Sequence, residues 1–438
     1  MKTTIHSVRG RQVWDSRGRP TVEAEVALAG GAVGRAIAPA GASRGRHEAA
    51  DRRDGGARFG GLGVEGATAA VSGEIAHALV GCDGGDQAEV DRRLCALDGG
   101  ADLARLGANA TTAVSLAALH AAAAAEGLPI WRQLAEGGRT RLPLPQVQIF
   151  GGGAHAGRRT DVQDFMIMAP KAGSVRRALE ITAEVYHAAG ALMAETGRLA
   201  GTADEGGWWP AFESTGQALE TLVRAIERAG HRPGEDVWIA LDIAASQFRH
   251  QGRYQLALEQ DSLDTVDMVE QVASWARAYP ILSIEDPLAE DDVAGMIAVT
   301  RALGGHTQIV GDDFLVTDAR RIAGAARQHA ANAALIKVNQ IGTVTQAHAA
   351  LAAAKAAGWG TIVSARSGES EDVSIAHLAV GWDAGQIKVG AFARSERMAK
   401  WNELLRIEEA LGAAGEFAGG DAFAFPAPAP RFSETDVR

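Results

Sequence analysis

The stretch Ala334-Leu335-Ile336-Lys337-Val338 shows the pattern that decides the fold, a short apolar strand that ends on a charged residue. Alanine-rich stretches typical of helices separate further runs of this form in the second half of the chain. Repeated strand and helix units predict a (β/α)8 barrel, which typically takes about 250 residues. The other apolar runs are residues 237–241, 281–284, 308–310, 361–363 and 386–387.

Carboxylates follow three of these runs directly or within two residues. They are Asp242, Glu285 and Asp312. The residue that closes a barrel strand faces the mouth of the barrel, where the chemistry takes place. Each carboxylate taken alone could cap a helix or pair with an arginine. Three in register repel one another, which favours a hard divalent cation, and oxygen ligands without a cysteine or histidine cluster favour Mg²⁺.

Cationic residues close the later strands. Lys337 lies between apolar neighbours, and crowding by other cations would lower the pKa of its ammonium group toward the range of a general base. Arg366, beside Ser367, and Lys388 offer fixed positive charge for a carboxylate or a phosphate. Glu205 lies in the tight turn Asp204-Glu205-Gly206-Gly207 and suits a general acid on a loop.

The first part of the chain has a different pattern. Residues 22–28 alternate apolar and polar, Gly30-Gly31 interrupts them, and residues 32–37 resume, which predicts an antiparallel hairpin. The small, apolar run 109–125 predicts a buried helix. We therefore expect three parts. They are an α+β domain over residues 1–138, the barrel over 139–417, and a Pro/Ala-rich tail over 418–438, in which we expect residues 423–431 to be mobile.

Composition excludes several classes of protein. Hydrophobic residues make up 47% and charged residues 22%, which are globular averages and argue against wholesale disorder. The formal net charge of −11 argues against general nucleic-acid binding, which needs a surplus of lysine and arginine. No uninterrupted apolar run reaches about 18 residues, and the N-terminus lacks the apolar core of a signal peptide. The expected location is the cytoplasm, without membrane attachment.

Nine motifs in the chain resemble those of enolase (phosphopyruvate hydratase) in order and spacing, from about residue 4 to 415. They are Asp15-Ser16-Arg17-Gly18, Gly41-Ala42-Ser43, His155-Ala156-Gly157, Asp204-Glu205-Gly206-Gly207, Ser283-Ile284-Glu285-Asp286, Gly311-Asp312-Asp313, Lys337-Val338-Asn339-Gln340-Ile341-Gly342, Arg366-Ser367-Gly368-Glu369 and Gly385-Gln386-Ile387-Lys388.

The resemblance implies a Mg²⁺-dependent lyase with two metal ions per active site, the second binding with the substrate. Lys337 matches the base that removes the proton next to the carboxylate, and Glu205 the acid that assists loss of the hydroxyl group. Asp164 stands where the family has a catalytic glutamate. The ligands implied for the first metal ion are Asp242, Glu285 and Asp312, and the ligand implied for the second is Ser43.

The resemblance also implies a small phosphorylated carboxylic acid as substrate, and a homodimer or higher homo-oligomer. Arg366 and Ser367 match phosphate contacts, Lys388 matches a carboxylate contact, and His155 matches an active-site histidine. Gln163, which precedes Asp164, is a further expected substrate contact.

The chain departs from the family pattern around the expected site. Ala365 replaces a histidine, and Arg44, on a loop expected to act as a lid, replaces a threonine. We expect Arg44 to contact the substrate. The loss of an imidazole and the gain of a lid arginine would alter both the free space and the charge of the expected active site. Further departures are Ala40 for serine, Gly151 for asparagine, Ala203 for glycine, Asp164 for glutamate, the added cation Arg46, and the bulky pair Trp208-Trp209.

Three hypotheses remain from the sequence. The first is an ordinary glycolytic enolase that converts 2-phosphoglycerate to phosphoenolpyruvate. The second, which the departures favour, is a specialised paralogue of the carboxyphosphonoenolpyruvate synthase type, from phosphonate biosynthesis. Its substrate is a 2-phosphoglycerate with a carboxyl group on phosphorus. The third is a catalytically inactive binding protein, against which the intact metal ligands and Lys337 argue.

Overall fold

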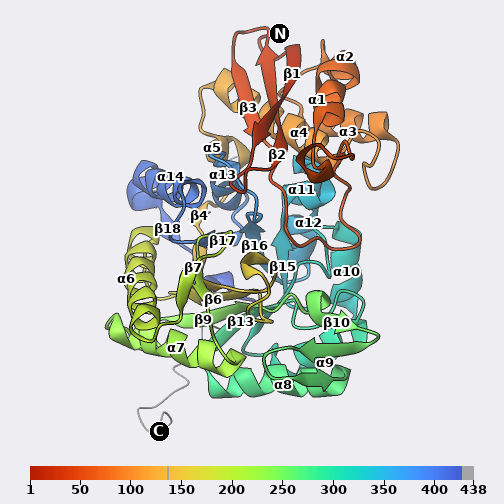
Figure 1. The fold of residues 1–438 in the computed structure, drawn as a ribbon. Helices are drawn as coiled ribbons and strands as arrows, with labels where there is room; N and C mark the ends of the chain where they lie inside the picture. The colour runs from red at the N-terminus through yellow and green to blue at the C-terminus, as the bar shows by residue number, and fades with distance from the viewer. Residues whose placement is uncertain (136–137, 427–438) are drawn as a thin grey trace.

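The N-terminal domain is built on a three-stranded antiparallel sheet (Figure 1). A computed structural model describes residues 1–135 and 138–426 of the chain. The predicted hairpin is confirmed, because Ala27 in the second strand pairs with Val33 in the third. The strands are β1 (Ile5–Trp14), β2 (Pro20–Leu28) and β3 (Val33–Ile37).

The predicted buried helix is also confirmed. It is α4 (Ala108–Glu126), whose small side chains are buried along nearly its whole length. The helix lies so close to β3 that a Cβ on Gly34 would be 2.1 Å from the carbonyl oxygen of Ala117. Small residues on both elements are therefore what allows this contact. The other helices before the barrel are α1 (Glu65–Ala70), α2 (Ala76–Leu79), α3 (Gln87–Asp98) and α5 (Ile130–Ala135).

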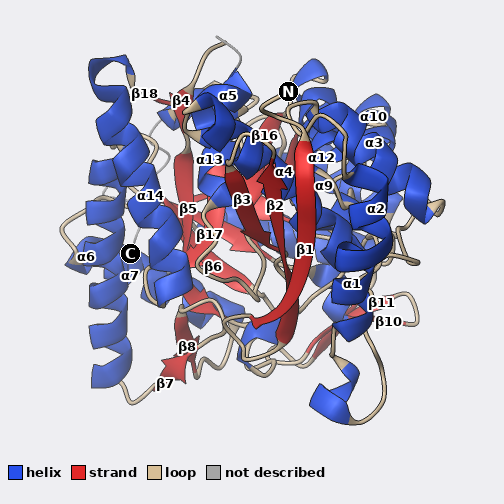
Figure 2. Ribbon diagram, turned by 90° about the horizontal axis from the view of Figure 1, so that it is seen from above, coloured by secondary structure: helices blue, strands red, loops and turns tan. Residues whose placement is uncertain are grey.

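The second domain is the predicted barrel, and it is closed. Eight strands follow one another in chain order around it, and the last pairs with the first through Lys388 and Gln146. Figure 2 shows the sheet of the N-terminal domain lying over these strands. The barrel strands are β5 (Leu144–Gly151), β6 (Asp164–Met168), β9 (Trp238–Asp242), β13 (Ile281–Glu285), β14 (Gln308–Gly311), β15 (Ala333–Ile336), β16 (Gly360–Ser364) and β17 (Gly385–Ala391).

One barrel strand runs against the others. β6 pairs antiparallel with both β5 and β9. The segment 152–163 that joins β5 to β6 contains one short 3-10 helix (Gly153–Ala156) and no α-helix, whereas a parallel pair needs a crossover that is usually an α-helix. Because β6 is reversed, its first residue, Asp164, lies at the rim where the other strands end, opposite Asp242.

Helices cover the outside of the barrel (Figure 1). Two of them, α6 and α7, lie in sequence between β6 and β9, with the small hairpin of β7 (Leu199–Thr202) and β8 (Trp208–Pro210) between them. The later helices alternate with strands. The longer barrel helices are α6 (Val175–Glu195), α7 (Thr215–Arg228), α8 (Thr265–Ala278), α9 (Val293–Leu303), α10 (Ala319–Arg327), α12 (Val344–Ala356), α13 (Ser374–Gly381) and α14 (Ser395–Leu411).

The first residues of the predicted tail pack against the barrel. Ala418, Ala422 and Phe423 are buried in one apolar cluster with residues of β5, β6, β9 and β13, including Trp238. Residues 427–438 of the predicted tail lie outside the described residues. Within the described part of the chain, no helix combines the length and apolar character needed to cross a lipid bilayer.

Candidate active site

The strand ends bring the predicted charged residues to one rim of the barrel. Asp242 ends β9 and Glu285 ends β13, and the two residues pair directly in the parallel register. Lys337 follows β15, and Lys388 lies within β17. Because neighbouring parallel strands end at the same edge, residues far apart in the chain meet there.

A small cavity lies at this rim, against the loop of the N-terminal domain that carries Ser43. The predicted site residues that line it are Ser43, His155, Gln163, Asp164, Glu205, Asp242, Lys337, Arg366, Ser367 and Lys388. Of the remaining three, Glu285 and Asp312 bond to lysines that line the cavity. Arg44 is not among the lining residues.

Two buried lysines neutralise the predicted metal ligands in this structure. The ammonium of Lys388 lies 2.7 Å from Asp242 Oδ2 and 2.8 Å from Glu285 Oε2. Lys337 donates to Asp312 Oδ2 at 2.5 Å. Burial is the largest influence and lowers the pKa of Lys337, but the negative charges around it, Asp312 first and then Glu285, together leave the pKa raised. The expectation of a lowered pKa is therefore wrong, because a carboxylate, and not another cation, lies closest to the ammonium group.

The donor set fits a hard divalent cation. Burial, with the neighbouring charge of Asp242, raises the pKa of Glu285 well above its usual value. Its Oε1 is buried without a hydrogen-bond partner. A carboxylate oxygen left in this way is open to a metal ion, and carboxylate oxygens are the ligands that Mg²⁺ prefers. A second acidic cluster is formed by Asp286, Asp312 and Asp313, whose ligand oxygens lie within 4.8 Å of one another and so have the spacing to hold a metal ion. Among the described residues, the set Asp242, Glu285 and Asp312 is not one of the groups with that spacing.

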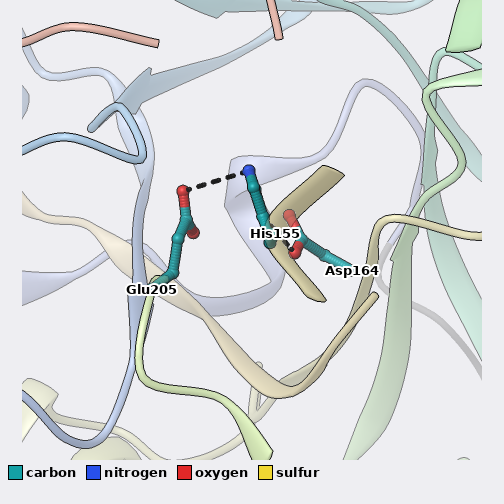
Figure 3. A group of neighbouring side chains, drawn as sticks. All are labelled: His155, Asp164 and Glu205. Atoms are coloured by element: carbon teal, nitrogen blue, oxygen red, sulfur yellow. Dashed lines mark hydrogen bonds and ion pairs between the residues drawn. The ribbon is translucent and has the colours of Figure 1, made fainter. Parts of the chain in front are cut away.

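His155, Asp164 and Glu205 form a third cluster, shown in Figure 3. His155 Nδ1 lies 3.2 Å from Asp164 Oδ1, and Nε2 lies 3.8 Å from Glu205 Oε1. Burial alone would raise the pKa of Asp164, but His155 and Lys388 lower it to about 2. Asp164 is therefore a stable carboxylate that faces the histidine, and Glu205 lies on the other side of the ring.

The turn that carries Glu205 is the predicted glycine turn, and it joins β7 to β8. Gly206 has φ of 91°, a left-handed conformation that glycine adopts without a steric penalty. The backbone carbonyl of Gly206 accepts a hydrogen bond from the Tyr186 hydroxyl group at 2.8 Å. The local sequence therefore sets the turn, and a tertiary contact from α6 holds it.

Arg366 is paired with a carboxylate that the sequence analysis did not single out. Its guanidinium donates to Glu48 Oε2 at 3.0 Å and to the carbonyl oxygen of Ser43 at 2.9 Å. The partner of Arg366 is therefore a residue of the loop. Ser367 Oγ accepts from the amide of Ala42 at 2.6 Å and so connects to the same loop. The sequence pattern alone does not identify Glu48 as a site residue, because it is one of several charged residues in this loop.

Two further side chains that the sequence analysis did not assign hold the site. Arg17 donates to Ser367 Oγ at 3.2 Å, and it belongs to a motif quoted above, which is the signal that could have found it. Gln148 in β5 hydrogen-bonds to Asp164. No local pattern marks Gln148, because its partner lies in another strand.

The departures from the family pattern differ in their distance from the cavity. Ala365 lines it. Arg44 instead donates to the carbonyl oxygen of Ala49 at 2.8 Å, and its Nε lies 3.8 Å from Glu48. Arg46 is largely exposed and lies beside Glu290. Trp208 stacks on Tyr186 away from the cavity, with ring centroids 4.6 Å apart.

Two of the departures belong together. A Cβ on Gly151 would lie 2.5 Å from the Cβ of Ala203, which is closer than two carbon atoms can approach. The methyl group of Ala203 therefore fits because position 151 has no side chain. The replacement of asparagine by glycine and of glycine by alanine is one packing change on neighbouring segments.

Fold and site together have the layout of a barrel enzyme, with its active site at one rim of the strands. Cations and carboxylates converge on one cavity at the carboxyl ends of barrel strands. Comparison with protein families gives the finer class. The model described as the enolase N-terminal domain matches residues 5–134, and that of the enolase C-terminal TIM barrel domain matches residues 139–425. The chain belongs to the enolase family and is a hydro-lyase of that family.

Proposed function

We propose that the protein removes the α-proton of a 2-phosphoglycerate-type substrate and eliminates water to give an enolpyruvate product. The observation that carries this proposal is that Lys337 and Glu205, which come from different elements, line one cavity. A lysine that has given up its ammonium proton and a carboxyl group at one site would provide a base for the α-proton and an acid for the leaving hydroxyl group.

The other lining residues suit the two anionic ends of such a substrate. Arg366 and Ser367 lie together on the loop after β16, where a phosphate would meet a planar donor and a hydroxyl group. Lys388 supplies a buried positive charge for the carboxylate end, and Gln163 and His155 complete the wall. These contacts orient the substrate and exclude water.

We propose Mg²⁺ as the metal, with two ions per site. Asp242, Glu285 and Asp312 would hold the first, and Ser43 on the loop would serve the second, which binds with the substrate. Bound Mg²⁺ would supply the dense positive charge that makes the weakly acidic proton next to a carboxylate removable. Without metal, Lys388 and Lys337 neutralise the carboxylates, so part of their hydrogen bonding would be exchanged when a cation binds.

For the substrate, we propose a 2-phosphoglycerate that carries a carboxyl group on phosphorus. Ala365 supports this, because an alanine in the cavity wall leaves the space that the family histidine fills. The added cations Arg44 and Arg46 lie on the loop that carries Ser43. To meet an additional anionic group, Arg44 would exchange its contact with the Ala49 carbonyl oxygen for that group.

A specific observation favours a second candidate, ordinary enolase activity. Arg44 lies outside the cavity lining, and its guanidinium donates to the carbonyl oxygen of Ala49. The deciding experiment measures kcat/KM for 2-phosphoglycerate and for its phosphorus-carboxylated form, in the wild type and in Arg44→Thr. The specialised function predicts a strong preference for the larger anion that Arg44→Thr largely removes. Ordinary efficiency on 2-phosphoglycerate with no such preference would support the second candidate, and metal-dependent exchange of the C2 proton would exclude an inactive scaffold.

A further inference from the structure

Gln148 connects two separate parts of the active site through one amide group. It lies in β5 and is 1% exposed. Its Nε2 donates to Asp164 Oδ1, and its Oε1 accepts from the backbone N–H of Gly207 at 2.9 Å. Asp164 begins β6, whereas Gly207 ends the turn that carries Glu205. The donor and the acceptor of the same amide are therefore both in use.

The neighbouring glycines leave room for this amide. A Cβ on Gly207 would lie 2.3 Å from Gln148 Oε1, so a larger residue there would displace the amide. A Cβ on Gly151 would lie 3.3 Å from both polar atoms of the Gln148 amide. A side chain at position 207 would therefore displace the Gln148 amide, and a side chain at position 151 would press closely against it.

The chain of contacts continues from Asp164 to Glu205. The same Oδ1 that accepts from Gln148 lies 3.2 Å from His155 Nδ1, and the far ring nitrogen faces Glu205 at 3.8 Å. The carboxylate partner of one ring nitrogen sets which nitrogen of a histidine carries the proton. Any shift of Asp164 would therefore change the orientation of the His155 ring and the distance between its Nε2 and Glu205.

We propose that Gln148 is a positioning residue that holds Asp164 and the Glu205 turn in a fixed relation and so orients His155 toward Glu205. Asp164 is one methylene shorter than the glutamate of the family pattern, and the side chain of Gln148 spans the distance to it. The proposal rests on the proposed role of Glu205 in catalysis. The positioning of His155 itself needs no substrate and can be tested separately.

The kinetic test shortens residue 148 by one methylene and, in a double variant, lengthens residue 164 by one. Gln148→Asn shortens the amide and breaks at least one of its two contacts, and we expect kcat to fall by about 10²-fold with little change in KM, because small misplacements cost that much. Gln148→Asn combined with Asp164→Glu restores the combined length of the two side chains. We expect this double variant to recover most of the lost kcat. Strictly additive losses in the double variant would overturn the proposal.

Gln146 offers a matched control on the same strand. It is equally buried at 1% exposed, and its Nε2 donates to Gln386 Oε1 at 2.8 Å away from the cavity lining. Gln146→Asn therefore removes a comparable buried amide contact and should leave kcat unchanged. Equal kcat values in the Gln146→Asn and Gln148→Asn variants would overturn the positioning role.

A readout without substrate separates this proposal from the proposed function. The ¹⁵N chemical shifts of the His155 ring, identified by their loss in His155→Gln, report which nitrogen carries the proton. We expect Gln148→Asn to change them, the double variant to restore them, and Gln146→Asn to leave them as in the wild type. If Gln148→Asn does not fold, Gln148→Met keeps the reach without the amide and should give the same change. Unchanged His155 shifts would overturn the proposal, whereas inactivity of the wild type on both substrates would overturn only the proposed function.

Discussion

The ammonium nitrogen of Lys337 lies 2.5 Å from Oδ2 of Asp312, so the proposed base is bonded to a proposed metal ligand. Gln340 donates to the other carboxylate oxygen of Asp312 at 2.8 Å. The Asp312 carboxylate is therefore held in place by two partners, and it in turn holds the Lys337 side chain. Binding of a metal ion to Asp312 and release of the Lys337 amine from Asp312 depend on each other, because both involve the same carboxylate.

Replacing the proposed base should separate catalysis from metal binding. Lys337→Ala removes the proton acceptor but leaves all three carboxylates, so we expect C2 proton exchange and elimination to fall by about 10²–10⁴-fold or more. The Mg²⁺-dependent rise in melting temperature should remain. Lys355→Ala, in which a lysine bonded to the Trp382 carbonyl oxygen is lost, serves as the control and should keep full activity. A Lys337→Ala enzyme with a tenth of the wild-type rate would place the base elsewhere.

Removing the divalent cation should stop activity and lower the melting temperature. A ligand that binds only the folded state stabilises it by about 2.7 kcal/mol at a hundred times its dissociation constant. Asp242→Asn and Glu285→Gln each remove an anionic ligand at nearly constant shape and should lose most of the Mg²⁺-dependent shift. Thermal melts with and without Mg²⁺ measure this shift in melting temperature.

The control for the metal prediction is Asp91→Asn. Asp91 is a buried carboxylate outside the cavity lining that accepts hydrogen bonds from Ser115 and Thr345. This variant should be destabilised to a similar extent and yet keep the Mg²⁺-dependent shift. An unchanged shift in Asp242→Asn and Glu285→Gln would place the metal at other residues, such as the cluster around Asp286.

Restoring an imidazole at position 365 should shift substrate preference. One preorganised hydrogen-bond donor at a reacting group contributes about 10²–10³-fold in rate. We therefore expect Ala365→His to raise kcat/KM for 2-phosphoglycerate by up to about 10²–10³-fold. The same variant should lower kcat/KM for the phosphorus-carboxylated substrate, because the imidazole fills the space that this substrate needs. The matched control is Ala365→Leu, which fills the same space without a donor and should lower both values. A gain for neither substrate in Ala365→His would contradict a role for this position in specificity.

Stability should fall in mild acid because of a buried histidine between the domains. His120 in α4 contacts Ser374 Oγ in α13 at 2.8 Å, and burial lowers its pKa although the charge of Asp372 opposes this. The unfolded chain, with a histidine pKa of about 6.5, then binds a proton that the folded protein does not. The contribution of His120 is therefore present above about pH 6.5 and is lost as pH falls below it.

Urea unfolding between pH 7.5 and 5 measures this effect. His120→Gln keeps a polar group near Ser374 but cannot take up a proton, so we expect a shallower loss of unfolding free energy with acid than in the wild type. His6→Gln, at an exposed position in β1, should follow the wild-type curve. A wild-type pH slope in His120→Gln would show that other groups cause the acid loss, among them His377, whose pKa burial also lowers.

Six of the eight barrel strands were predictable because each is a short apolar run closed by a polar residue. β5 and β6 were not predicted. β5 contains Gln146 and Gln148, which are buried at 1% exposed and break the apolar pattern, since their hydrogen-bond partners lie in other strands. The reversal of β6 was also beyond the sequence reasoning, although the reversal explains why Asp164 reaches the site from the start of its strand.

The sequence by itself determined the family, the order of six of the eight barrel strands, and most of the residue types that face the cavity, because these depend on local periodicity and motif spacing. Only the tertiary structure decided which charges meet. The pairing of Arg366 with Glu48, of Lys337 with Asp312, and of Lys388 with Asp242 and Glu285 joins residues from separate strands and loops. The pKa of Lys337 shows the consequence, because its direction depends on the balance between burial and the charges of both signs around it, and barrel closure sets those distances.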